Sequence, residues 1–290
     1  HLEHAEFERA SEAVLGGAEQ AGGPVFVAFE RQHRIHHVLQ QPRPRELAVL
    51  GDVPHHHHRH VVLFGEADQL GEHGIEVKKN LHGVGKNMQD HLQARLVYKC
   101  NEPTLNDEVS SLFGQARIGL KYLTSRSGPM TMAASLATGF IKTRDDLETP
   151  DVQLHVQPLS AESPGKGADK VSAFTMSVCQ LRPESRGHIH ITSAQSSVYP
   201  KITPNYLSAA ADELCAIRAV KCARAMAKSS ELSPDIVREH VPVGDPQTDE
   251  ELLDAARSIS QTIYHPTSTC RMGHDTAAVV DDRLRVHGIA

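Results

Sequence analysis

Apolar and polar positions alternate with a period of two in several short segments of the chain, and this alternation predicts strands with one buried face. The segments with this pattern are residues 93–98 (QARLVY), 151–157 (DVQLHVQ), 173–181 (AFTMSVCQL) and 187–192 (GHIHIT). A tight PESRG turn joins the last two and favours a hairpin-like pair. Together with interleaved helices, these strands predict an α+β fold, with an antiparallel sheet backed by helices over residues 93–264.

Three longer segments repeat their apolar residues with the 3.6-residue period of helices. The first spans Val109–Leu123 and ends at a Ser-Gly-Pro turn, residues 127–129. Ser208 can cap the second, and Thr248 with Glu251 forms a capping box at the start of the third. The apolar positions are Val109, Leu112, Phe113, Ala116, Leu120 and Leu123 in the first, Leu214, Ile217, Val220, Ala223 and Met226 in the second, and Leu252, Leu253, Ala256 and Ile259 in the third.

The N-terminal third of the chain divides into a part with secondary-structure patterns and a part without them. Residues 66–92 predict a short helix, a turn, a strand and a glycine loop. Residues 1–64 show no sustained helical or alternating period, and Val25–Phe29 is their one short strand candidate. Ten of the 20 histidines lie in this region, including the run HHHHRH at His55–His60. We therefore treat residues 1–65 as an anomalous, His-rich leader.

Three interpretations of the leader stay open. It could bind zinc, nickel or copper through its consecutive imidazoles, but a contiguous run cannot wrap one ion tetrahedrally. It could be a disordered, solvated segment. It could also be a shifted or antisense reading frame joined to a true coding region, which would give this kind of unpatterned text.

Composition narrows the function classes. A formal charge of −6 gives no basic field to recruit nucleic acid or an anionic membrane surface. Mean hydropathy is −0.36, and no apolar run approaches the roughly 18 residues of a membrane helix. The five scattered cysteines form no CxxC pair, so neither a disulfide scaffold nor a zinc site is predicted. We expect a soluble, cytoplasmic protein without a metal site.

The stretch YHPTSTCRMG, Tyr264–Gly273, concentrates candidate chemistry in one polar loop. A residue before proline avoids the helical region of backbone space, which restricts His265. Hydroxyls at residues 267–269 can bond the ring or the backbone and fix a tautomer. A positioned imidazole is a suitable general base for removing a proton from an alcohol. Cys270 is a weaker candidate nucleophile, since it lies five residues from that histidine with no evident activating group.

Three further motifs each allow a structural and a functional interpretation. His155 shares a strand face with Gln153 and Gln157, so these side chains could line a cavity, although a single strand histidine is more often structural. Gly83–His91 (GVGKNMQDH) lacks the third glycine of a dinucleotide fingerprint, which favours an ordinary loop. The two histidines of GHIHIT could chelate a metal, but with no third ligand in view an exposed strand face is favoured.

Three motifs in order resemble the C-terminal half of glucose-methanol-choline (GMC) flavoprotein oxidoreductases. They are HGIEVKKNLHGVGKNMQDHL, SRGHIHITSAQSSVYPKITPNYL and YHPTSTCRMG followed by VVDDRLRVHGIA. The resemblance covers residues 66–290, roughly three quarters of the chain, and is strongest to bacterial choline-dehydrogenase-like alcohol dehydrogenases. Each motif alone is weak, but the three together are specific.

The resemblance implies FAD-dependent oxidation of a choline-like or other primary alcohol to an aldehyde, by hydride transfer to flavin. His265 would be the catalytic base that faces the reactive edge of the flavin. His155, in PDVQLH, would line the alcohol pocket, and Asn87 would contact the cofactor. The cofactor supplies the redox chemistry, while the protein supplies position and electrostatics.

The sequence departs from the family pattern at both ends. Residues 1–64 contain nothing like the strand, GxGxxG and helix that cradle the FAD pyrophosphate. HHHHRHVVLFG replaces an expected SGIG-like segment, and this abrupt break near Gly65 favours the wrong-frame origin of the leader. The family also continues past VHG with a segment that carries a second catalytic His or Asn. We therefore expect a fragment with little independent activity.

The resemblance divides the chain into four segments. Residues 1–65 form the leader, 66–92 a remnant of the FAD-binding domain with its connecting loop, 93–264 the substrate-binding domain, and 265–290 the truncated start of the return segment of the FAD domain. Apolar faces of the two flanking segments would then be exposed, which predicts self-association.

Two other function classes stay open beside the alcohol-oxidising enzyme. One is a non-catalytic binding module that reuses the substrate-domain sheet, and the other is a metal-binding protein that uses His55–His60. Only the active enzyme requires flavin absorbance of the purified chain. Retained zinc or nickel that is lost when the histidine run is deleted would indicate the metal-binding protein.

Overall fold

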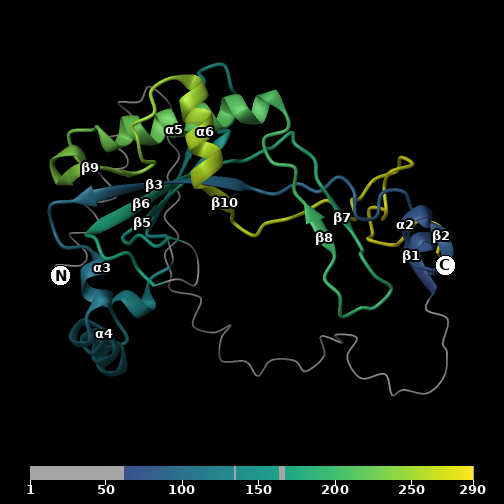
Figure 1. Cartoon of the computed structure of the whole chain (residues 1–290), viewed down its shortest axis with the longest axis horizontal. Coiled ribbons are helices and arrows are strands. Elements are labelled where there is room, and N and C mark those ends of the chain that lie inside the picture. Colours follow the sequence, from purple (N-terminus) through teal and green to yellow (C-terminus); the bar gives the residue numbers. More distant parts are fainter. Residues whose placement is uncertain (1–61, 134, 163–166, 290) are drawn as a thin grey trace. The chain divides into compact units, whose positions relative to one another are not determined.

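A computed structural model of the chain describes residues 62–133, 135–162 and 167–289 (Figure 1). They form two compact units. Val25–Phe29, the histidine run and the three interpretations of the leader therefore lie outside the described residues. No helix in the described part combines the length and apolarity that crossing a bilayer requires.

Unit 1, Met88–His188 and Thr203–Ser268, is built around a sheet in which the described residues form six antiparallel strands. The strand order is β10-β3-β6-β5-β4, and β9 also pairs with β3. The bounds are β3 Leu92–Cys100, β4 Ala137–Ile141, β5 Val152–Gln157, β6 Ala173–Gln180, β9 Ile236–Val241 and β10 Ser260–Thr262. The predicted combination of helices with an antiparallel sheet is confirmed, while β4, β9 and β10 were not predicted.

One face of this sheet is apolar because side chains alternate along each strand. Helices α5 (Ala210–Ala227) and α6 (Asp249–Ile259) both pack against it (Figure 1). Each fully buried aliphatic side chain contributes about 1.5–3 kcal/mol to stability, so this layer is the core of the unit. The buried side chains of the strands and helices include Leu96, Val152, Leu154, Met176, Val178, Val220, Ala223 and Leu252.

Of the two N-terminal caps predicted for these helices, the one of α6 is confirmed and the one of α5 is wrong. Thr248 and Glu251 form the expected capping box, with the Glu251 N–H donating to Thr248 Oγ1 at 3.2 Å. Helix α5 starts one residue later than predicted, with Ala209 rather than Ser208 at the N-cap position and no side-chain cap. The predicted core residue Leu214 is 47% exposed, whereas its neighbour Cys215 is buried.

The helix predicted over Val109–Leu123 is two helices. Thr104 caps α3 (Leu105–Ser110), and Ser111 breaks the helix by adopting an extended backbone with ψ 141°. Its hydroxyl then accepts the Gly114 N–H at 2.9 Å and caps α4 (Leu112–Ser125). A serine that bonds the backbone locally competes with helix continuation, and the periodicity did not reveal this competition.

The hairpin predicted between residues 173–181 and 187–192 is also wrong. β7 (His188–His190) pairs with β8 (Lys201–Thr203) in a separate two-stranded sheet, not with β6. The cause is the buried carboxylate of Asp212, which accepts the backbone N–H groups of Glu184 and Ser185, each at 2.8 Å. These bonds hold the PESRG segment at the start of α5 instead of closing a tight turn.

Unit 2 comprises residues 62–87, Ile189–Ile202 and 269–289. Its strands β1 (Val62–Gly65) and β2 (Glu76–Asn80) are parallel and are connected through α2 (Ala67–Glu72). The predicted short helix, turn and strand are thus confirmed. The assignment of this unit to a flavin-binding domain stays a prediction. Two 3₁₀ turns of unit 1, η2 (Pro129–Thr131) and η3 (Ser233–Asp235), complete the elements.

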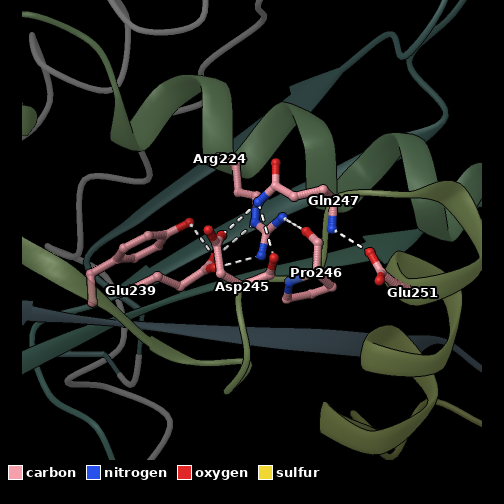
Figure 2. A network of polar contacts seen from close by, with 7 residues as sticks. Arg224, Glu239, Asp245, Pro246, Gln247 and Glu251 are labelled. Carbon is pink, nitrogen blue, oxygen red and sulfur yellow. Dashed lines mark hydrogen bonds and ion pairs between the residues drawn. The ribbon is translucent and has the colours of Figure 1, made fainter.

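A charged network ties α5 to β9 in unit 1, as Figure 2 shows. Arg224 donates from Nε and Nη2 to the two carboxylate oxygens of Glu239, at 3.0 and 2.5 Å, and from Nη1 to the Pro246 carbonyl. Both side chains of the ion pair are largely buried, at 14% and 16% exposure. The Tyr98 hydroxyl lies 3.5 Å from Glu239, and burial followed by this carboxylate raises the pKa of Tyr98 well above its usual range.

Because the pair is buried, removal of one charge should cost more than removal of both. We expect Glu239→Gln to lower the free energy of unfolding by about 3 kcal/mol, since the Arg224 guanidinium is left without its anion. The double variant Arg224→Met, Glu239→Leu should lose clearly less. Urea unfolding at neutral pH measures both, and equal losses in the two variants would contradict this account.

Candidate functional site

The HPTSTC loop, residues 265–270, begins in unit 1, where its first four residues are held along the segment that leads into β3. Gln89 and Thr267 exchange two backbone hydrogen bonds, at 3.0 and 2.8 Å. On the other side of the loop the Ile263 N–H donates to the His91 carbonyl at 3.2 Å. These bonds lie on either side of His265 and bring it beside β3.

Asp90 is the anchor of this loop. Its Oδ1 accepts the backbone N–H of His265 at 2.9 Å, and its Oδ2 accepts the Thr262 hydroxyl at 2.5 Å and the Tyr206 hydroxyl. Burial, followed by the bond to Asp90, raises the pKa of Tyr206 to about 12, so the phenol stays protonated and donates. One half-buried carboxylate therefore connects three segments that are far apart in sequence.

The backbone turns sharply on both sides of the histidine. Tyr264 has a φ of 63° and Ser268 a φ of 74°, which is the left-handed region. Such conformations cost about 1–3 kcal/mol for residues other than glycine and persist only where other contacts impose them. The Tyr264 N–H donates to Thr262 Oγ1 at 2.8 Å, and the imidazole of His265 is exposed.

Three histidines from different segments come together in unit 1. The rings of His265 and His91 meet edge to face, with centroids 5.9 Å apart. Nδ1 of His91 lies 2.7 Å from the Gln180 carbonyl and therefore carries its proton. His155, on β5, is half-buried, and its Nδ1 lies 3.3 Å from Thr138 Oγ1. Burial, followed by the charges of the other two histidines, lowers the pKa of His155, so its ring is neutral at pH 7.

His155 belongs to a polar row on the face of the sheet opposite α5 and α6. Thr138, His155, Ser177 and Arg95 are successive register partners across β4, β5, β6 and β3. Ser177 Oγ is buried without a hydrogen-bond partner among the described residues. With its amide turned to suit, Gln261 accepts from Arg95 Nη1 at 2.6 Å. The row therefore places hydroxyl, imidazole and guanidinium groups side by side on one face of the sheet.

The predicted site residues are only partly brought together. His265 lies close enough to His155 for its charge to lower the pKa of His155. The predicted alternation in β5 is confirmed, since Val152 and Leu154 are buried while the histidine is half-buried. Asn87 lies at the edge of unit 2 with a φ of 61°, and its contact with a cofactor stays a prediction. Within the described residues, no three His, Cys, Asp or Glu side chains converge well enough to hold a metal ion, the histidine trio included.

Sequence reasoning missed several members of the site. His91 and Asp90 stand in the quoted motif GVGKNMQDH, which the pattern favoured as an ordinary loop. An Asp-His pair directly before a strand was the available signal. Thr262 and Tyr206 carry no local signal, because their role exists only through the distant carboxylate.

Comparison with known proteins assigns part of the chain to a family. The family model described as GMC oxidoreductase matches residues 183–290. These residues belong to the GMC oxidoreductase family. The resemblance read from the three motifs is thereby confirmed.

Two relatives and one solved structure match a longer part of the chain. An alcohol dehydrogenase (acceptor) of Pseudomonas putida is 36% identical over 226 residues, which is 78% of this chain and 41% of the relative. An oxygen-dependent choline dehydrogenase of Cronobacter sakazakii (strain ATCC BAA-894) is 36% identical over 225 residues, 78% of this chain and 40% of the relative.

A formate oxidase of Aspergillus oryzae RIB40 shares the fold, with a TM-score of 0.69 at 23% identity over 78% of this chain and 44% of that chain. The curated relatives are oxidoreductases by name. This chain spans about two fifths of the length of these relatives.

If Asp90 fixes the loop, its removal should free the His265 amide. We expect Asp90→Ala to lower stability by about 1–3 kcal/mol, because the backbone N–H and two hydroxyls lose their common acceptor. Hydrogen exchange of the His265 amide should accelerate in this variant. Asp145→Ala, an exposed aspartate of the same unit, is the control. Unchanged exchange at His265 in Asp90→Ala would contradict the anchoring role.

The lowered pKa of His155 makes stability depend on pH. Between its folded pKa and the ordinary value of 6.5, the unfolded chain binds more protons, so the free energy of unfolding rises with pH across this window. Stability is therefore lost as the pH falls through 6.5. His155→Gln should flatten the loss between about pH 7 and pH 5. Urea unfolding across this range tests it, with the exposed His274→Gln as the control.

Proposed function

We propose that this chain supplies the substrate-binding part of an FAD-dependent enzyme that oxidises a primary alcohol to an aldehyde. The observation that carries the proposal is the exposed imidazole of His265, whose backbone is fixed by Asp90 beside the polar face of the sheet. The names of relatives that are 36% identical, an alcohol dehydrogenase and a choline dehydrogenase, support this substrate class.

His265 is the proposed general base. An alcohol must lose its hydroxyl proton before, or together with, the hydride on its carbon, and a positioned imidazole accepts that proton at near-neutral pH. The loop fixes the backbone of His265. The backbone hydrogen bonds between Gln89 and Thr267 hold it on one side, and the left-handed residues Tyr264 and Ser268 turn it on both sides. Positioning of this kind reduces the entropy lost on the way to the transition state.

His155 is the proposed orienting group. Its neutral ring can donate a hydrogen bond to the substrate oxygen or accept one from it, and Thr138 beside it restrains the ring. In this proposal His155 stays neutral, and His265 is the ring that carries the proton after it has left the alcohol. The neighbouring Ser177 hydroxyl, buried and unpartnered among the described residues, is a further group that a polar ligand would satisfy.

The proposed site residues fit the reacting, flavin end of FAD better than its dinucleotide end. When bound, FAD supplies the two-electron acceptor for the alcohol. The polar sheet face and the HPTSTC loop fit the reacting end, where a substrate and a base are needed. Asn87 and the loop that begins at Gly83 are the proposed contacts in unit 2. The sequence contains no GxGxxG motif for the pyrophosphate, so the dinucleotide end is not accounted for by this motif.

The test is reduction of bound FAD by alcohols in a chimera in which the 226 matching residues of this chain replace those of the Pseudomonas putida alcohol dehydrogenase (acceptor), because the chain spans only 41% of that relative. We expect flavin binding, followed by loss of the oxidised flavin absorbance with primary alcohols. His265→Asn should slow this reduction by about 10²–10⁴-fold without equal loss of flavin binding, because only proton transfer is removed. Choline and simple primary alcohols are compared as substrates.

The matched control is His274→Asn, an exposed histidine of unit 2. It should reduce flavin at the rate of the unsubstituted chimera. Binding of FAD with no alcohol-dependent reduction would contradict the proposed reaction. A rate that is the same in His265→Asn and the unsubstituted chimera would leave the reaction standing but contradict the base.

A further inference from the structure

A cleft of about 980 Å³ lies in unit 1 between the C-terminal half of α5, strand β9 and residues 242–247. This volume is at the upper end of the range for small-molecule sites, roughly 300–1,000 Å³. The described residues that line it include none of the candidate site around His265. Figure 2 shows part of its lining, with Arg224 of α5 pointing toward Glu239 and Asp245. The cleft would therefore be a second site.

Two of the four Lys and Arg side chains in the cleft are already neutralised by carboxylates. Arg224 donates to both carboxylate oxygens of Glu239, at 3.0 and 2.5 Å, and both side chains are largely buried. Lys221 forms an ion pair with Asp249, which lies at the start of α6. A cationic ligand would have to displace partners that the protein itself supplies, so these pairs do not select for one.

The other two cations of the cleft have no such partner. Lys228 at the end of α5 and Arg238 on β9 make no side-chain ion pair or hydrogen bond with any other described residue. The remaining carboxylate of the lining, Asp245, accepts the side-chain amide of Gln247 at 2.7 Å. With Asp249 included, four cations stand against three carboxylates, in a chain whose formal charge is −6. The unbalanced charge of the cleft is positive.

His240 adds an unpaired polar group to the same lining. Its Nδ1 is buried and has no hydrogen-bond partner among the described residues, so no bond at this nitrogen fixes the ring. An unpartnered buried nitrogen costs free energy that a ligand with a suitable oxygen would recover. Apolar side chains complete this part of the cleft, namely Ile236, Pro242 and Val243, and the last is 88% exposed.

We propose that this cleft binds a small organic anion, in which a phosphate or carboxylate group is joined to an apolar body. Arg238 and Lys228 bind the anionic group, because the planar fork of a guanidinium matches the oxygens of both groups. His240 donates a further hydrogen bond to it, and Val243 covers the apolar body. An inorganic anion alone would leave the apolar side chains uncovered.

Isothermal titration calorimetry of the whole chain with phenyl phosphate tests the proposal independently of flavin chemistry. We expect binding that weakens with salt, and slower hydrogen exchange of the backbone amides in residues 238–247. Phenol lacks the anion and inorganic phosphate lacks the ring, so each should bind at least about tenfold more weakly.

Substitutions in the lining locate the binding site. Arg238→Gln with Lys228→Gln should weaken phenyl phosphate binding at least about tenfold, because two charge-assisted hydrogen bonds are lost. His240→Phe keeps a ring of similar shape without its nitrogens and should weaken binding about fivefold. Both cations are exposed and unpaired among the described residues, so their substitution should leave the urea unfolding midpoint unchanged.

The matched control is Lys170→Gln, which removes an exposed cation elsewhere in unit 1. It should bind phenyl phosphate like the native chain. Absence of binding would overturn the proposal, as would native affinity in the Arg238→Gln, Lys228→Gln variant. Tighter binding of benzylamine than of phenyl phosphate would also overturn it, since the carboxylates would then be the ligand-binding groups.

Discussion

The position of the candidate base depends on one carboxylate. Asp90 receives a backbone N–H from the HPTSTC loop and hydroxyls from Thr262 and Tyr206. The loop contains left-handed residues that are not glycine, so its own preferences would not hold this shape. Hydrogen bonds to an ionised acceptor are about twice as strong as neutral ones, and here three of them converge on one side chain. The geometry of His265 therefore follows from a residue that the sequence analysis did not select.

Side chains of the sheet in unit 1 alternate between two faces. One face forms the core, and the other carries the polar candidate site residues. In β5, Val152 and Leu154 are buried against the helix-covered face, while His155, the residue after Leu154, belongs to the opposite, polar face. A one-residue slip would exchange these faces, so the core that α5 and α6 cover also fixes the register of the polar row. A rigid scaffold of this kind lets functional groups sit on a loop without losing their geometry.

Local patterns predicted the elements whose causes are local. The alternation of residues 151–157 gave β5, and the Thr248–Glu251 box gave the start of α6. Predictions failed where a distant or competing hydrogen bond determines the backbone conformation. Asp212 holds the amides that follow β6 and prevents the hairpin, and Ser111 recaps a helix that periodicity had continued. The same distinction applies to the site, because two histidines were found from their motifs whereas Tyr206, 116 residues from Asp90, could not be.

The apolar residues of the helix predicted over residues 109–123 form a stripe that lies outside the core of unit 1. Leu112, Phe113, Leu120 and Leu123 of α4 are 63–85% exposed. Their periodicity predicted a helix, but it could not say whether the stripe faces the core, because Ile118 and Gly114 alone fill that contact.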